Sequence, residues 1–290
     1  MSSEYLNVLN RVSSAEEVAV SLQKLMNKLK GEYITEAGQA INYTALRESD
    51  LFQRYLLVTQ QLREVNLASL SEEENKAFFI NVYNALTIHG IAASDTIPQS
   101  VLEIDKFWET TAYNVGGFNL SLDDIEHGIL RGNAPHPSRS QPQFDSKDPR
   151  LQFSLRNRDP RIHFALVCGA KSCPAVSVYT TENLERALST AAESFCQQEV
   201  QVDISKKQVT MSKIFQWYMT DFAPSPKELV SSRISVVGSP MSSAPGPSKR
   251  TSTGLASCQK SSFKNYQAWT MPRLLKVLFI RNISYSTDAS

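Results

Sequence analysis

The sequence predicts an α+β fold, a mainly helical domain with a small, mostly antiparallel sheet. The first observation is helical periodicity: apolar residues recur every three or four positions over 14–30, and the run over 76–90 is apolar nearly all the way round. The second is alternation around a Gly-Gly pair over 113–120, which is typical of a β-hairpin. The third is a pair of short strand-like runs, 200–202 and 208–211, on either side of a basic turn.

The first and the central helix each have a clear start signal. Ser14 followed by Glu17, and Ser71 followed by Glu74, both match the capping box, in which a serine and a glutamate three residues later satisfy each other's backbone amides. Gly90 is the expected end of the central helix, since glycine commonly terminates helices.

The middle of the chain is expected to hold a helix, a loop and a strand. Ser121 is expected to cap a short helix with the sequence LDDIEHGILR, whose acidic first turns suit a helix N-terminus. The polar, proline-bearing segment 132–159 predicts a long surface loop. The apolar run 163–167 predicts a short strand that ends at Cys168.

Charge divides the chain into unlike parts. Its 290 residues carry a net charge of +1, but residues 231–290 hold eight Lys/Arg and one Asp, which leaves 22 basic and 28 acidic residues in 1–230. The segment 231–250 is also rich in Ser and Pro. We therefore expect an N-terminal helical segment over 1–41, one α+β domain over 42–230 and a disordered basic tail over 231–290.

The bulk composition favours an intracellular protein. The near-zero net charge gives no reason to expect nucleic acid as a partner, and no apolar run is long enough to span a bilayer. Four cysteines are too few for a secreted disulfide framework, and the N-terminus lacks the basic and apolar regions of a signal peptide. The expected compartment is the cytoplasm, with no membrane association.

Two segments concentrate the groups that can do chemistry: SLDDIEHGILR over 121–131 and DPRIHFALVCGAKSCP over 159–174. Together with the helix sequence FINVYN over 79–84 and the Gly-Gly hairpin, they occur in the order and spacing typical of the DUF547 family. The chain resembles that family from about residue 42 to residue 222. The resemblance implies a domain with no assigned activity, in which Glu126, His127 and Cys168 are the most characteristic positions.

Cys168 is the candidate nucleophile, because a thiolate at a strand end beside a glycine is accessible to a substrate. His127 and His163 are the candidate bases, and Glu126 or Asp159 could orient one of them. The resemblance ranks the pair Cys168–His127 first, with Glu126 as the third site residue. The simpler alternative is that the cysteine packs in the core and the histidine caps nearby carbonyls.

Other roles for these segments remain open. Cys168 and Cys173 could form a regulatory disulfide, or bind a metal with His163, although their spacing differs from common zinc sites. We expect no metal and no cofactor. Asn81 and Asn84 lie in an apolar helix, where buried amides need partners, so we expect them to tie down a neighbouring loop.

Two functions from different classes follow. The first is a cysteine-dependent hydrolase or acyl transferase, in which Cys168 attacks, His127 is the base and Glu126 orients or polarises its neighbours. The second is a non-catalytic protein-interaction domain, in which the same residues form a polar network that fixes the fold. The partner is an unknown protein or small molecule in either case.

Overall fold

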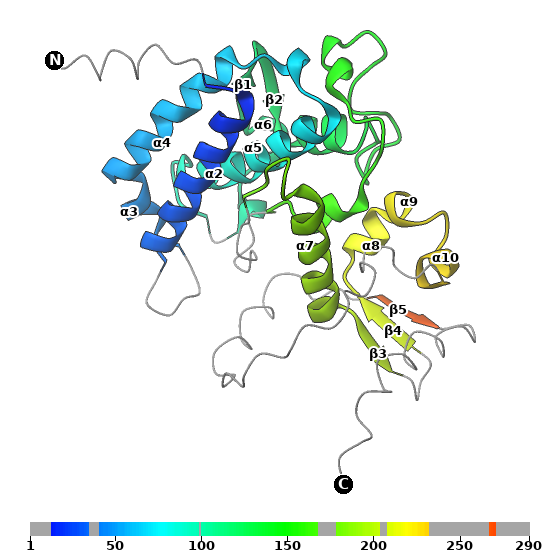
Figure 1. The fold of residues 1–290 in the computed structure, drawn as a ribbon. Helices are drawn as coiled ribbons and strands as arrows, with labels where there is room; N and C mark the ends of the chain where they lie inside the picture. Colours follow the sequence, from blue (N-terminus) through cyan, green and yellow to red (C-terminus); the bar gives the residue numbers. More distant parts are fainter. Residues whose placement is uncertain are drawn as a thin grey trace, which may run out of the picture. The chain divides into compact units, whose positions relative to one another are not determined.

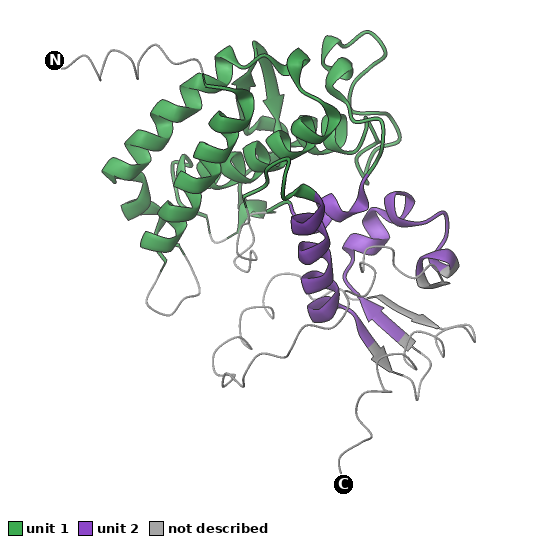
Figure 2. Cartoon of the chain, viewed as in Figure 1, with its two compact units in different colours: residues 1–158, 166–184 green, residues 159–165, 185–290 purple. Residues whose placement is uncertain are grey.

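The computed structural model describes residues 13–34, 41–98, 100–167, 178–203, 208–231 and 267–270. The chain divides into two compact units (Figure 2): unit 1 comprises Met1–Arg158 and Leu166–Leu184, and unit 2 comprises Asp159–Ala165 and Glu185–Ser290. The fold class is α+β, mainly helical, with small antiparallel sheets, as predicted. No helix among the described residues is both long and apolar enough to cross a membrane.

Unit 1 is built from helices around one hairpin. Its elements are α2 (Ala15–Glu32), α3 (Tyr43–Arg47), α4 (Asp50–Gln61), η1 (Leu62–Glu64), η2 (Leu67–Ser69), α5 (Glu72–Ala92), η3 (Val101–Glu103), α6 (Phe107–Thr110), β1 (Ala112–Val115), β2 (Phe118–Ser121), η4 (Asp124–Leu130) and η5 (Pro149–Phe153).

Helix α5 is the core of unit 1. It lies beside α2 (Figure 1) and packs against α2, α3 and η4. Most of its residues from Asn75 onward are buried, as its all-round apolar sequence predicts. The predicted capping box is present, because the amide of Glu74 donates to Ser71 Oγ and the amide of Ser71 donates to the Glu74 carboxylate. The capping box of Ser14 and Glu17 is present at the start of α2 as well.

The prediction that α5 ends at Gly90 is wrong, since the helix continues to Ala92. Gly90 serves close packing instead: a Cβ at this position would lie 2.5 Å from a methyl carbon of Thr111. The predicted hairpin is confirmed, with Val115 opposite Phe118 and positive φ angles of 56° and 85° at Gly116 and Gly117, which a tight two-residue turn requires.

The helix predicted after Ser121 is a π-helix, η4. Its i→i+5 hydrogen bonds include the Arg131 amide to the Glu126 carbonyl at 2.8 Å and the Asn133 amide to the Gly128 carbonyl at 3.0 Å. All seven residues of η4 are buried. The loop after it is not purely a surface loop as predicted, because Phe144 and Phe153 are buried and 149–153 form η5.

Unit 2 contains η6 (Pro160–Phe164), α7 (Leu184–Glu199), β3 (Gln201–Asp203), β4 (Gln208–Met211), α8 (Ile214–Trp217), α9 (Met219–Phe222), α10 (Pro226–Ser231) and β5 (Gln267–Thr270), with the first residue of α7 counted in unit 1. The predicted pairing of β3 with β4 is confirmed, and β5 adds to β4 in the antiparallel sense. Apart from β5, the segment predicted to be a disordered tail lies outside the described residues from 232 onward.

The strand predicted over 163–167 is wrong, because 160–164 form a 3₁₀ turn. Asp159 caps this turn by accepting from the Arg161 amide, and Pro160 at its first position has the φ angle that suits a helical turn. Phe164 then enters the core of unit 2, where Cys196 is also buried.

Candidate functional site

Two asparagines of α5 hold both ends of the segment that carries Cys168. The Asn84 carbonyl oxygen accepts a 2.8 Å hydrogen bond from the backbone amide of Val167, and Asn81 exchanges two hydrogen bonds with the backbone of Tyr179. Both asparagines are buried. The prediction that these amides tie down a neighbouring loop is therefore confirmed. Cys168 and Cys173 themselves lie outside the described residues, between the two anchored ends.

Glu126 is tied to the same helix. The hydroxyl of Tyr83 donates to Glu126 Oε2 at 3.0 Å, and both side chains are buried. Tyr83 directly precedes Asn84, so neighbouring residues of α5 hold the Glu126 carboxylate and the residue before Cys168. A hydrogen bond to a buried carboxylate is stronger than one between neutral groups, which makes this a firm positional constraint on Glu126.

His127 is 1% exposed, and its ring is held by Arg131. Arg131 Nη1 lies 2.9 Å from His127 Nδ1 and also donates to the carbonyl of Pro135 at 2.8 Å. Because a guanidinium can only donate, Nδ1 accepts this bond, and a neutral imidazole then carries its proton on Nε2. Nε2 lies 3.8 Å from Asp123 Oδ1, one π-helical turn away.

Asp123 and His136 complete the cluster around His127. The rings of His127 and His136 meet edge to face with their centroids 4.8 Å apart. Burial and the neighbouring Glu126 raise the pKa of Asp123 to about 6, and Arg139 opposes this shift from 3.5 Å. Burial and Arg139 lower the pKa of His136, while Glu126 opposes that shift.

Glycine at position 128 lets the π-helix η4 pack directly against the Phe144 ring. The Phe144 ring lies against it, and a Cβ there would be 2.3 Å from two ring carbons. The hydroxyl of Ser154 donates to the Gly128 carbonyl at 2.6 Å. The glycine of the IEHG sequence is thus needed for packing under the helix, and it directly follows the candidate residues Glu126 and His127.

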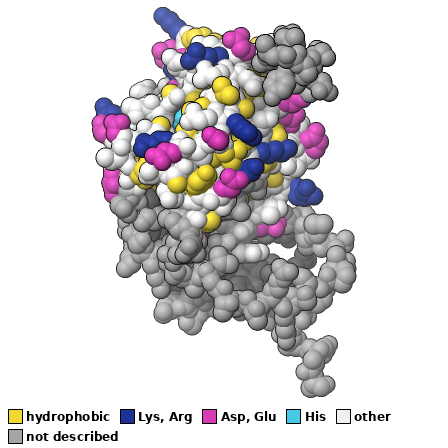
Figure 3. Space-filling view, turned by 90° about the vertical axis from the view of Figure 1, so that its left-hand side faces the viewer, with side chains coloured by type: hydrophobic (Ala, Val, Ile, Leu, Met, Phe, Trp, Pro, Cys, Tyr) yellow, Lys and Arg dark blue, Asp and Glu magenta, His cyan; other side chains and the backbone are white. Residues whose placement is uncertain are grey.

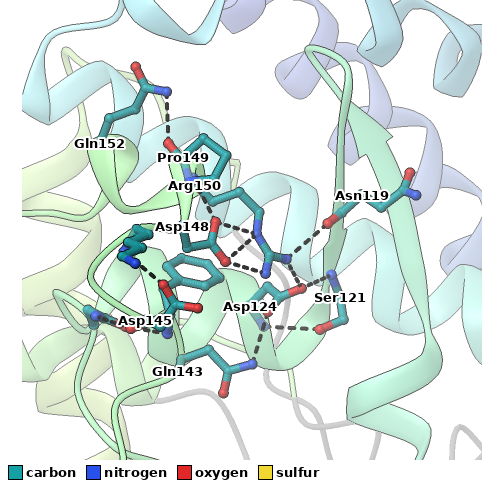
Figure 4. A network of polar contacts seen from close by, with 12 residues as sticks. Asn119, Ser121, Asp124, Gln143, Asp145, Asp148, Pro149, Arg150 and Gln152 are labelled. Carbon is teal, nitrogen blue, oxygen red and sulfur yellow. Dashed lines mark hydrogen bonds and ion pairs between the residues drawn. The ribbon is translucent and has the colours of Figure 1, made fainter.

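Asp124 has a structural role at the start of η4. Its carboxylate accepts from the Ser121 amide at 3.0 Å, from Gln143 at 2.9 Å and from Arg150 at 2.9 Å, as Figure 4 shows. Arg150 is fixed in turn by Asp148. This network secures the start of η4, so the two adjacent aspartates differ: Asp124 holds the backbone and Asp123 faces the histidines.

The other candidate base, His163, lies in unit 2 and has its own partner. Its Nε2 is 2.9 Å from Asp221 Oδ2, and the ring stacks on Tyr218 at 3.9 Å between centroids. Both His163 and Asp221 have almost fully buried side chains. Asp159, the other carboxylate considered as an orienting group, pairs with Arg161 instead, through bonds of 2.9 and 2.8 Å.

Sequence reasoning missed Asp123 and His136 as members of the cluster. The spacing of Asp123 and His127, four residues apart on one helix, is a signal that could have identified the first. His136 sits in the polar loop, and only the fold brings it to His127.

No curated protein and no solved structure matches this chain. Residues 67–196 match the family model described as "Protein of unknown function, DUF547". That range contains the α5 helix, the hairpin, η4 and the Cys168 segment, which are the blocks that suggested the resemblance. The predicted resemblance to the DUF547 family is confirmed over residues 67–196.

Proposed function

We propose that the DUF547 region is an enzyme domain that hydrolyses or transfers an acyl group, with Cys168 as nucleophile, His127 as base and Glu126 as the carboxylate beside it. One observation carries the proposal: adjacent residues of α5, Tyr83 and Asn84, bind Glu126 and the amide of Val167. The two blocks that bear the thiol and the imidazole are therefore attached to the same turn of one buried helix.

The chemistry follows the usual course of a thiol nucleophile. The Cys168 thiol gives its proton to His127 Nε2 while sulfur attacks the acyl carbon, and the imidazolium then protonates the leaving group. Water, or an acceptor hydroxyl or amine, attacks the thioester and releases the acyl group, which restores the thiol. The negative charge of Glu126 favours the imidazolium that forms in between.

The arrangement of Arg131 sets a condition on this mechanism. Nε2 can take a proton only if its lone pair is available, so the ring proton of neutral His127 must sit on Nδ1. Arg131 must then release Nδ1, while its hydrogen bond to the Pro135 carbonyl can remain in place. Substrate binding would have to drive this exchange, which makes Arg131 a positioning residue for the base.

Thiol labelling of the full chain tests the proposal. Iodoacetamide at neutral pH, with the modified cysteines identified by mass spectrometry, should label Cys168 at least about tenfold faster than Cys196, since the thiolate is the reacting form. Cys196 is an internal reference, because burial raises the pKa of its thiol to about 11. Cys168→Ala should remove the fast phase and leave the slow one.

A second variant separates the nucleophile from its base. His127→Gln keeps a hydrogen-bonding side chain but cannot be protonated, and it should slow the labelling of Cys168. If Cys168 is as slow as Cys196 in the folded protein, the enzyme proposal fails and the interaction-domain alternative gains. If labelling is fast but His127→Gln leaves it unchanged, the assignment of the base is wrong.

The interaction-domain alternative lacks a comparable observation. On the face drawn in Figure 3, apolar side chains are interspersed with Lys, Arg, Asp and Glu. A mixed face of this kind specifies no single chemistry of partner.

A further inference from the structure

Three side chains around η4 have the composition of a metal site. Asp123, His127 and His136 each offer one ligand atom, and these atoms all lie within 4.8 Å of one another. We propose that they bind a divalent transition-metal ion such as Zn²⁺, and that this ion occupies the nitrogen of His127 that serves as base in the proposed function. The proposal departs from the sequence-based expectation of no metal.

The separation of Asp123 and His127 supports a shared ion. Their Oδ1 and Nε2 atoms are 3.8 Å apart, which is too long for a direct hydrogen bond. Two metal bonds of about 2.0–2.2 Å each span such a distance. Asp123 is the residue just before η4 and His127 lies one turn further along; both side chains are buried, so the pair is already organised without a change in the backbone.

His136 is held in a way that suits a third ligand. Its Nδ1 lies 2.7 Å from Ser138 Oγ and accepts a 3.1 Å hydrogen bond from the Ser138 amide, so a neutral ring carries its proton on Nε2. Binding of an ion through Nε2 moves the ring proton to Nδ1, which gives up the bond from the Ser138 amide. The Ser138 hydroxyl can then accept the hydrogen bond of Nδ1, as the outer partners of metal-bound histidines commonly do. Two imidazoles and one carboxylate form a ligand set typical of divalent transition metals.

The surrounding charges predict moderate rather than tight binding. The carboxylates of Asp123 and Glu126 attract a cation, whereas Arg131 and Arg139 oppose it. Binding through Nε2 of His127 also requires Arg131 to release Nδ1, since that nitrogen must carry the ring proton. Three protein ligands leave at least one coordination position for water. Such an open position distinguishes this set from structural zinc sites, which have four protein ligands.

The metal and the base function use the same lone pair. An ion on Nε2 of His127 prevents that nitrogen from taking a proton from Cys168. This consequence rests on the proposed function, while metal binding itself does not. The expected behaviour is a domain whose thiol reacts fast without metal and slowly when Zn²⁺ is bound.

Metal binding is tested on the full chain by titration with Co²⁺, followed by absorption spectroscopy, and then by competition with Zn²⁺. The wild type should show the visible bands of cobalt with nitrogen and oxygen ligands, without the strong near-ultraviolet band of a thiolate ligand. His136→Ala should weaken binding at least about tenfold, as loss of a contributing group at a metal site does. Asp123→Asn provides a second variant should the first fail to fold.

Glu109→Gln is the matched control. Glu109 binds Arg139 at 2.6 Å but is outside the ligand set, so its variant removes a nearby charge and no ligand, and it should weaken cobalt binding much less than His136→Ala. Absence of binding, a thiolate-type spectrum, or equal affinity in wild type and His136→Ala would overturn the metal site.

The labelling of Cys168 with and without Zn²⁺ tests the competition. Zn²⁺ should slow labelling in the wild type and in Glu109→Gln but much less in His136→Ala, which separates the site from direct binding of Zn²⁺ to thiols. Cobalt binding that depends on His136 but leaves the labelling rate unchanged would refute the competition. Failure of the proposed function is seen separately, as slow labelling in metal-free protein.

Discussion

The side-chain amide of Asn81 pairs with the backbone of Tyr179 in both directions: its Nδ2 donates to the Tyr179 carbonyl at 2.6 Å, and its Oδ1 accepts from the Tyr179 amide at 3.0 Å. Asn84, one turn further along α5, accepts from the amide of Val167. The segment between these anchors is attached to the buried helix at each end by its own asparagine.

The two anchors should be separable by hydrogen exchange. Asn81→Ala should speed exchange of the Tyr179 amide, and Asn84→Ala that of the Val167 amide, each by about 10- to 100-fold, because losing a buried hydrogen-bond partner costs about 1–3 kcal/mol. Each variant is the control for the other, as each should leave the opposite end protected. Equal acceleration at both ends in either variant would contradict independent anchoring.

The bond between Tyr83 and Glu126 should contribute measurably to stability. Tyr83→Phe removes only the donor hydroxyl and should lower the free energy of unfolding by about 2 kcal/mol, as expected for a buried bond to a charged group. Urea denaturation of Tyr83→Phe, Glu126→Gln and the double variant gives the coupling energy. Additive effects of the two substitutions would mean that the hydrogen bond has no specific role.

Local rules made much of the fold predictable. Ser71 with Glu74 signals a helix start because capping depends on residues three apart, and Gly116 with Gly117 signals a tight turn because both need a positive φ angle. The site was predictable only in part. The resemblance points to Glu126 and His127, but no local pattern predicts their contacts to Tyr83 and Arg131.

The errors concern features that depend on distant contacts. The sequence predicts a helix end at Gly90, but a glycine is needed there because the Thr111 side chain packs against it and leaves no room for a Cβ. No local pattern pairs His136 with His127, because only the packed loop brings the two rings together. The π-helical hydrogen bonds of η4 likewise cannot be predicted from the local sequence, because the same residues are compatible with i→i+5 and with i→i+4 bonding.

Acid should destabilise the fold partly through His89. Its Nδ1 is 2.7 Å from the Tyr113 hydroxyl, which in turn lies 2.6 Å from that of Tyr55. Burial lowers the pKa of His89 from 6.5 to about 4, so the unfolded chain binds a proton in a range where the folded chain does not. This contribution to stability is present above pH 6.5 and is lost as the pH falls toward 4.

The loss due to His89 should reach about 2 kcal/mol at about pH 5, from the size of this pKa difference. It is measured by urea denaturation at neutral and acidic pH for the wild type and His89→Phe. The acid titration of the carboxylates is common to both proteins, so the variant should lose less stability between the two pH values. An identical loss in the two proteins would exclude His89 as a cause.

Replacement of Gly128 by alanine should strain the support of η4. The added methyl group would lie 2.3 Å from the Phe144 ring, so the ring or the helix must move, at a cost of about 1–3 kcal/mol. Gly31→Ala is the matched control, because a Cβ at Gly31 of α2 meets no atom within 4 Å. Alanine in a helix should stabilise that variant by about 0.5–1 kcal/mol.

Thermal and urea unfolding measure the stabilities of Gly128→Ala and Gly31→Ala relative to the wild type. Adding Phe144→Leu to the Gly128→Ala variant then tests whether the Phe144 ring is the source of the strain. Because leucine is smaller than phenylalanine, the double variant should lose less stability than the sum of the two single substitutions. Strict additivity, or a Gly128→Ala protein as stable as wild type, would show that the ring does not confine the helix at this point. A favourable interaction between the two substitutions would identify contact with Phe144 as the reason that the IEHG sequence ends in glycine.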